Sequence, residues 1–480
     1  MPDIRLPEGL QPVCAPWVAG DGDTTCVIAR DCGHRESLVV QGNSSGFVGS
    51  EEDGVCTCPL SLANARALSR MFPELSPRRV PEALSSFGFG DRLGLATPGH
   101  VRSLKEHDIF PMLAQQSVRE NARTGRSFAD VLRDAIFGAF RAGYTRGFGA
   151  DADHLKAVAD AVVAARVGFT FFTCDPGDHV CNPEGLSSSD LRTEFERLDA
   201  AADWSARYLQ QVYEVGDGVV LRFAEEELWR AAIKYGRAIS HAADMHEHLT
   251  QLLPEGFDFE VSVDETESPT TPLEHLFVAL ELRARGVGFV SLAPRFVGAM
   301  EKGVDWRGNM EQFHDELRMH ARIARFAGGY RLSLHSGSDK FSLYRLFAQE
   351  TEGRCHVKTA GTSYLVALQL VAVENPSLFR EIASLSLAAF AEERATYHIS
   401  ADVGLIPPLG SLADEELPML VEAHDSRQVL HVGYGSVLSS SLGNQLIRTL
   451  VEHQAEHGAA LASHLGRHIQ LLAGGFDGKA

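Results

Sequence analysis

Cysteine is scarce in this sequence, with eight residues among 480. Most of them lie near the N-terminus, and they lack the paired C-x2-C spacing that structural zinc sites use. We therefore expect reduced thiols with a structural role rather than bound zinc. The N-terminal group consists of Cys14, Cys26, Cys32, Cys56 and Cys58.

The sequence also lacks a long hydrophobic run and an excess of positive charge. No apolar stretch approaches the ~20 residues of a membrane helix, and the N-terminus has no basic segment followed by an apolar run. The 64 acidic residues against 44 Lys and Arg give a formal charge of -20, which repels nucleic acid and anionic membranes. We expect a cytoplasmic protein that binds neither, and an anionic ligand would need a local cationic pocket.

Apolar strand-like runs alternate with amphipathic helical stretches from residue 84 onward, which predicts a parallel α/β sheet. An open doubly wound sheet more often has about five or six strands and a glycine-rich phosphate loop after the first. The number of predicted strands favours instead a closed (β/α)8 barrel of the TIM type. The strands span 85–91, 109–117, 146–151, 169–175, 257–265, 287–296, 331–335 and 355–360.

The segments around the barrel have different patterns. Residues 1–80 combine short β-rich runs with one helical stretch and predict a small α/β cap. The barrel occupies residues 81–374, and its pattern stretches after the fourth strand, which predicts a helical insertion at 180–255 that shapes or covers the active site. Residues 375–480 are mostly helical, interrupted at 428–436, and predict an extension outside the barrel or at a homo-oligomer contact.

Polar side chains accumulate at the predicted carboxyl ends of the strands, where barrel enzymes carry their catalytic groups. The third strand runs into Asp153 and His154, and the seventh ends at His335. Because these ends meet in a barrel, both histidines are candidate ligands of one divalent metal, with Zn, Mn, Co and Ni all plausible. Glu301, after the sixth strand, is either the third ligand or a solvated loop acid.

Carboxylates at the same ends suggest acid/base chemistry. Asp153 suits a general base, although a carboxylate that only orients a metal ligand would occupy the same position. On the fifth strand, Glu260 or Glu265 is a candidate second acid/base. Acids buried in the barrel and paired with Lys358 would give the same pattern.

Several cationic and polar residues at the strand ends are candidates for binding an anionic substrate. Five cations are unusual at these positions in an acidic chain. They are Arg92, Arg119, Arg295, Lys340 and Lys358, and Gln116 and Asp339 complete the predicted substrate-binding set.

These residues lie in blocks that resemble the tagaturonate epimerase family of hexuronate catabolism. The blocks are FGFGDRLGLATPGH (87–100), AQQSVREN (114–121), GFGADADH (147–154), VDET (263–266), SLHSGSDKF (333–341) and HVKTAGTSY (356–364). The resemblance implies a metal-dependent interconversion of D-tagaturonate and D-fructuronate. It also implies that Asp153 and a strand-five glutamate are the acid/base pair and that His154 and His335 bind the metal. It is weak in residues 1–80.

The same strand-end pattern looks locally like that of class II, metal-dependent aldolases, and this likeness suggests a mechanism. The carbon to be inverted lies β to the substrate ketone, so its hydrogen is not acidic. Retro-aldol cleavage followed by re-addition on the other face inverts this carbon without removing that hydrogen. Two alternatives stay open: a class II-type lyase that releases its fragments, and a non-catalytic uronate-binding barrel with a structural metal.

Overall fold

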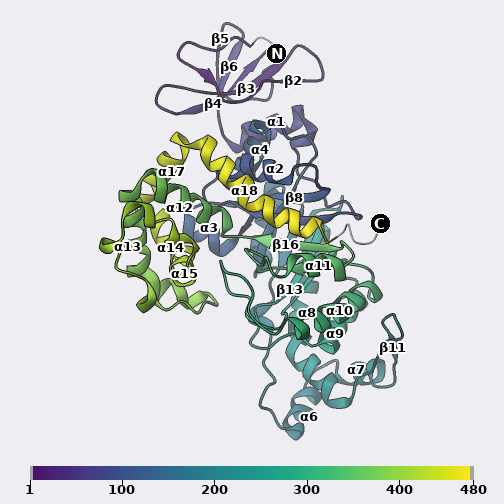
Figure 1. Ribbon diagram of the computed structural model, residues 1–480. Helices are drawn as coiled ribbons and strands as arrows, with labels where there is room; N and C mark the ends of the chain where they lie inside the picture. Colours follow the sequence, from purple (N-terminus) through teal and green to yellow (C-terminus); the bar gives the residue numbers. More distant parts are fainter. Residues whose placement is uncertain (1–3, 476–480) are drawn as a thin grey trace.

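Eight parallel strands close into a barrel at the centre of the molecule, which confirms the predicted fold (Figure 1). The computed structural model describes residues 4–475, so the outermost residues of the predicted cap and tail lie outside the described residues. Each strand pairs with the next along the chain, and the last pairs with the first. The strands are β7 (Ser85–Gly90), β8 (Ile109–Ser117), β9 (Gly149–Leu155), β10 (Phe171–Cys174), β13 (Asp258–Val263), β14 (Ser291–Pro294), β15 (Arg331–Leu334) and β16 (Cys355–Thr359).

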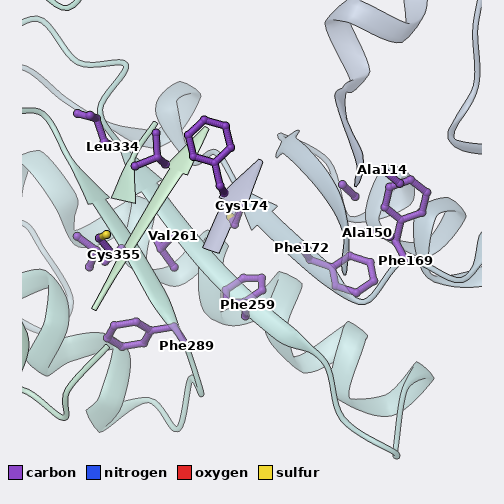
Figure 2. Packing of buried hydrophobic residues seen from close by; sticks show 14 of the residues in the cluster. Ala114, Ala150, Phe169, Phe172, Cys174, Phe259, Val261, Phe289, Leu334 and Cys355 are labelled. Atoms are coloured by element: carbon purple, nitrogen blue, oxygen red, sulfur yellow. The ribbon is translucent and has the colours of Figure 1, made fainter. Parts of the chain in front are cut away.

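Alternation along the strands separates an apolar outer face from a polar interior. Phe259 and Val261 of β13 pack in the main hydrophobic core together with Phe172 of the neighbouring β10 (Figure 2). The intervening residues Glu260 and Ser262 bond to side chains of β16 and of the segment after β15, so they point into the barrel. A small apolar cluster forms the floor of the interior, and it contains Val80, Phe110, Met112 and Phe171.

Helices cover the outside of the barrel. Seven of them follow barrel strands directly or after a loop: α2 (Thr97–Leu104), α4 (Phe128–Arg141), α5 (Val158–Val167), α8 (Glu225–Leu252), α9 (Pro272–Ala284), α10 (Met310–Phe326) and α11 (Tyr344–Glu350). The remaining gap in the ring is filled by the last helix of the chain, α18 (Gln454–Ala473), which packs against both α2 and α11. Its Leu461, Leu465 and Ile469 belong to the main core. The C-terminal segment thus completes the barrel's helical ring.

The segment after the fourth strand contains η2 (Gly177–His179), α6 (Ser188–Glu196), α7 (Ala201–Tyr208) and a hairpin of β11 (Tyr213–Glu214) and β12 (Val220–Leu221). Helix α8, which the sequence analysis places within the insertion, packs between α5 and α9 as the fourth helix of the ring. The inserted helices α6 and α7 pack on α8, and Trp204 lies edge-on against Phe277 of α9, with ring centroids 5.4 Å apart. These helices therefore cover the outside of the barrel wall.

The N-terminal segment forms an antiparallel sheet on one side of the barrel (Figure 1). Its strands are β1 (Gln11–Pro12), β2 (Trp17–Val18), β3 (Thr25–Arg30), β4 (Glu36–Gln41), β5 (Ser50–Glu52) and β6 (Val55–Pro59), followed by α1 (Leu62–Met71) and η1 (Pro73–Leu75). Trp17 contacts Phe140 of α4 at 5.0 Å between ring centroids, and α1 also packs on α4. All eight cysteines of the chain have free thiols.

The helices between the last strand and α18 form a second hydrophobic core beside the barrel. They are α12 (Thr362–Glu374), α13 (Pro376–Glu393), α14 (Met419–Glu422), α15 (His424–Val432), α16 (Tyr434–Leu438) and α17 (Ser441–Glu452), with the short turns η3 (Arg394–Thr396), η4 (Val403–Leu405), η5 (Leu409–Ser411) and η6 (Asp414–Glu416). The interruption predicted at 428–436 is wrong, because α15 and α16 cover most of it. Within residues 4–475, no helix has the length and apolar character needed to cross a membrane.

Candidate active site

The two strand-end histidines meet at the carboxyl end of the barrel. His335 Nε2 lies 2.9 Å from Asp153 Oδ1, and His154 Nδ1 lies 3.0 Å from Asp153 Oδ2. The two imidazole rings stack with their centroids 4.2 Å apart. One donor atom from each of these residues lies within 4.8 Å of the others. Two imidazoles and a carboxylate at this spacing fit a divalent cation such as Zn or Mn.

A bulge in β9 brings both Asp153 and His154 to the site. Neighbouring residues of a regular strand point to opposite faces. The pairing of β9 with β10 shifts by one residue between Ala152 and Leu155, and His154 has a φ of 50°. This left-handed conformation is rare for a residue other than glycine and is typical of strained functional positions.

Ser262 and Asp264, at the end of the fifth strand, orient His335. Its Nδ1 lies 2.8 Å from Ser262 Oγ and 3.0 Å from Asp264 Oδ1. Burial raises the pKa of Asp264, but the charge and hydrogen bond of His335 outweigh this and lower that pKa to about 2. The period-two pattern 260, 262, 264 places Asp264 on the inner face, but only the folded barrel shows its contact with His335.

Lys358 of β16 lies at the centre of an ion cluster inside the barrel. Its Nζ is 2.8 Å from Asp151 Oδ2 and 2.9 Å from both Asp153 Oδ1 and Glu260 Oε1. Burial opposes its charge, yet the three carboxylates raise the pKa of Lys358 above its ordinary value. The head group of Lys358 is therefore occupied by protein carboxylates, and its role in substrate binding stays a prediction.

The two candidate glutamates of the fifth strand differ in their contact with this cluster, because Glu260 pairs with Lys358 and Glu265 does not. Burial raises the pKa of Glu260, but Lys358 outweighs it and lowers the pKa to about 2. Glu260 is thus the buried, lysine-paired acid that the sequence analysis leaves open. Glu265 instead lines a cavity of about 260 Å³ at this end, 3.4 Å from His154 Nε2 and 3.6 Å from Arg119.

A second group of possible metal ligands shares His154 and adds two carboxylates, Asp175 and Glu265. Glu301, predicted as the third ligand, is in neither group. Its carboxylate accepts hydrogen bonds from Arg307 (2.8 Å), Ser400 (2.7 Å) and Gln428 (2.9 Å). The structure therefore offers Asp153 as a carboxylate partner of both histidines, and Asp175 and Glu265 as carboxylate partners of His154.

Two of the predicted substrate-binding cations hold the protein's own chain. Arg92 donates to Glu120 at 2.7 and 3.0 Å, and its guanidinium lies 3.7 Å from the centre of the Tyr434 ring. Lys340 is buried, and its ammonium donates to the backbone carbonyls of Glu301, Val304 and Ser338 at 2.9, 2.6 and 2.9 Å. Both head groups are thus bound within the protein, and both residues also line a small cavity of about 30 Å³. Their role in substrate binding stays a prediction.

Asp339, also predicted to bind substrate, ties the C-terminal helices to the loop that follows His335. Its carboxylate lies 2.6 Å from His464 Nε2 of α18 and accepts from Arg427 of α15 at 3.0 Å. Its spacing with His464 and His468 resembles a metal site. However, His468 Nε2 accepts from the Asp339 amide, and its Nδ1 lies 3.0 Å from a backbone carbonyl. His468 therefore has no lone pair left for a cation.

The register of β8 points Gln115, not the predicted Gln116, into the barrel. Gln115 pairs with the inward-facing Asp151, whereas Gln116 pairs with Ala152. The pairing with β9 shifts between Met112 and Ala114, which reverses the alternation after that point. Alternation counted from the start of the strand would instead turn Gln116 inward, and the role of Gln116 in substrate binding stays a prediction.

Two adjoining cavities open beside this cluster. The larger, of about 260 Å³, is lined by Glu265, Arg295 and His398, and the smaller, of about 30 Å³, by Asp153, His154 and Arg119. They share the wall residues Lys302, His335, Ser336 and Tyr397. Lys302 and the C-terminal Tyr397 and His398 were missed by the sequence analysis, because no strand-end pattern marks them.

A polar cavity at the carboxyl end of a parallel barrel, beside paired histidines and carboxylates, defines a barrel enzyme for a small polar ligand. A sequence model of the tagaturonate epimerase family matches residues 20–472. The chain belongs to this family. The resemblance inferred from the motifs is confirmed, and with it the expectation of an isomerase-class enzyme.

Individual relatives agree over nearly the whole chain. The tagaturonate/fructuronate epimerase of Thermotoga maritima is 50% identical over 418 residues, which cover 87% of this chain and 86% of the relative. The native crystal structure of the fructuronate-tagaturonate epimerase from Cohnella laeviribosi has a TM-score of 0.92 at 38% identity and covers 97% of each chain. The complex of that enzyme with one glycerol has the same TM-score and identity, with 96% of each chain covered.

The contacts of Asp339 predict a structural role. Asp339→Asn removes a buried charge that pairs with the half-buried Arg427, so we expect the free energy of unfolding to fall by about 3–5 kcal/mol. Asp53→Asn, which breaks an exposed pair with Arg5, should change it by less than about 0.5 kcal/mol. Urea unfolding measures both. An unchanged midpoint together with a raised KM for Asp339→Asn would instead support substrate binding.

Proposed function

We propose that this chain interconverts D-tagaturonate and D-fructuronate and that it depends on a divalent metal. The names of its relatives support the reaction. The observation that carries metal dependence is the convergence of Asp153, His154 and His335 at the mouth of the barrel. When bound there, a divalent cation supplies Lewis-acid polarisation of the substrate ketone.

The mechanism that fits the substrate is retro-aldol cleavage and re-addition. A carboxylate removes the proton of the hydroxyl on the carbon to be inverted, and the bond between this carbon and its neighbour on the ketone side breaks. The bonding pair passes to the ketone side, which leaves an aldehyde and an enediolate. The aldehyde rotates and is attacked on its other face, and its oxygen takes back a proton. Atoms and charge are conserved, and no oxidant is needed.

In this proposal, two carboxylates that flank His154 share the proton transfers. Asp153 lines the smaller cavity and Glu265 the larger, so each can reach the hydroxyl in one of its two orientations. We assign proton removal from one epimer to Asp153 and from the other to Glu265. Burial raises the pKa of both, but His154 outweighs it and lowers both pKa values, so both carboxylates are ionised at neutral pH.

Several expectations from the sequence stay predictions: the cytoplasmic location, the homo-oligomer and the choice among Zn, Mn, Co and Ni. We keep the division of the chain at residues 80 and 374 as a proposal. In this division, α18 belongs to the C-terminal unit but completes the helical ring of the barrel unit.

Removal of either histidine is expected to remove the metal. His154→Ala and His335→Ala should each lose bound metal and activity, because losing one of two imidazoles leaves too little affinity. Elemental analysis of the purified variants measures this. Glu301→Gln is the control and should retain the metal. Full metal occupancy in both histidine variants would contradict the assignment. If only one variant lost the metal, the histidine replaced in the other variant would orient a ligand rather than bind the metal.

The two proposed bases should differ in behaviour from Glu260. Asp153→Asn and Glu265→Gln keep the side-chain size and are expected to lower kcat by about 10²- to 10⁴-fold with the metal retained. Glu260→Gln takes a carboxylate from Lys358 and should chiefly lower the melting temperature. Steady-state kinetics and thermal melting separate the cases. If Glu260→Gln were stable but inactive and Glu265→Gln stayed active, Glu260 would be the base and Glu265 would not.

Isotope exchange tests the mechanism itself. In retro-aldol inversion the hydrogen on the inverted carbon stays attached throughout, so turnover in D2O should give product without deuterium at that position. NMR of the product reports this directly. Stoichiometric deuterium there would rule out the cleavage path and indicate direct removal of that hydrogen.

A further inference from the structure

Lys302 is a half-buried cation in the active site without an acidic partner. It lies in the wall shared by both cavities, and its ammonium donates to Ser336 Oγ at 2.9 Å. Among residues 4–475 its ammonium forms no ion pair, although its charge contributes to lowering the pKa of Glu265 in the same cavity. Ser336 directly follows His335 in the chain, so Lys302 contacts the residue next to a proposed metal ligand.

Arg295 is the second such cation. It lines the larger cavity, and no ion pair is formed by its guanidinium within the described part of the chain. The other cations of this region differ, since Arg92 binds Glu120, Arg119 lies 3.6 Å from Glu265, and the ammonium groups of Lys340 and Lys358 are enclosed. Among the residues that the structure describes, Arg295 and Lys302 are therefore the lysine and arginine side chains that line the larger cavity without an ion pair.

This arrangement is unusual for the chain as a whole. The protein carries 64 acidic residues, a formal excess of 20 negative charges, yet these two cations form no ion pair within residues 4–475, although Asp264 and Glu265 line the same cavity. A partly buried charge without a partner costs free energy, and a bound anion recovers that cost. The cavity thus provides the local cationic pocket that an anionic ligand needs in an acidic protein.

The loop that carries Lys302 is held firmly in place. The backbone carbonyl of Glu301 accepts from the buried Lys340 at 2.9 Å, and its carboxylate is bonded to Arg307, Ser400 and Gln428. Glu301 therefore acts as an anchor for its neighbour Lys302. A head group positioned before the ligand arrives loses less entropy on binding.

We propose that Lys302, together with Arg295, binds the carboxylate of the sugar acid and selects it over a neutral ketose. The larger cavity is lined by His335 and Glu265 as well as by both cations, so one ligand can meet the metal centre and the anion site together. The proposal rests on the proposed function for the identity of the acid. The recognition of a carboxylate by these two residues is independent of the mechanism.

The test compares acid and neutral ligands in matched variants. Lys302→Met and Arg295→Met remove the charges, Lys302→Arg keeps one, and Arg192→Met removes an exposed charge of the insertion as a control. kcat/KM is measured for tagaturonate and for the ketohexose that carries a hydroxymethyl group in place of the carboxylate. Inhibition constants are measured for a six-carbon aldonate and for the corresponding polyol.

For Lys302→Met we expect kcat/KM for the acid to fall on the order of 10²-fold, mainly through KM, and the aldonate inhibition constant to rise by a similar factor. Values for the neutral sugar and the polyol should stay within about threefold, because these ligands have no charge to lose. Arg295→Met should act in the same direction, Lys302→Arg should retain most of the preference, and Arg192→Met should match the wild type.

Equal losses for acid and neutral ligands in Lys302→Met would overturn the proposal and place Lys302 in the chemistry or the fold. An unchanged preference would overturn it as well. Failure of the proposed function is a separate result: the wild type would then not epimerise tagaturonate. The inhibition constants would still show whether Lys302 and Arg295 select a carboxylate.

Discussion

The active site depends on one buried ion cluster. The ammonium of Lys358 contacts Asp151, Asp153 and Glu260, which reach it from β9 and β13 across the barrel from β16. Without Lys358, the three carboxylates would share a buried space and could not all stay charged. The cluster thereby fixes Asp153, whose oxygens also contact His154 and His335.

A second constraint is the break in the pleat of β9. A regular strand would direct Asp153 inward and His154 outward, toward the helices. The bulge and the positive φ of His154 turn both side chains to the mouth of the barrel. The strained backbone is held in place by the surrounding contacts, among them the stacked ring of His335. This local distortion brings the proposed base and the proposed metal ligand, which are neighbours in the sequence, to the same site.

The C-terminal segment joins the barrel and the site into one structure. Helix α18 closes the ring, while Arg427 of α15 and His464 of α18 hold Asp339 in the loop after His335. Tyr397, between α13 and α15, lines both cavities. A barrel that ended after its eighth strand would therefore lack a helix of its wall, the support of the His335 loop and part of its substrate cavity.

The sequence by itself determined the barrel and the central trio of Asp153, His154 and His335, because strand periodicity and polar residues at strand ends are local signals. It did not reveal which charged groups are free. Lys340 and Lys358 look like anion-binding residues until the fold encloses them, and Lys302 shows no pattern until Ser336 comes beside it. A one-residue shift in β8 likewise turns Gln115, rather than Gln116, into the barrel. Only the tertiary structure decided these assignments, since pairing, burial and register depend on contacts between residues far apart in the chain.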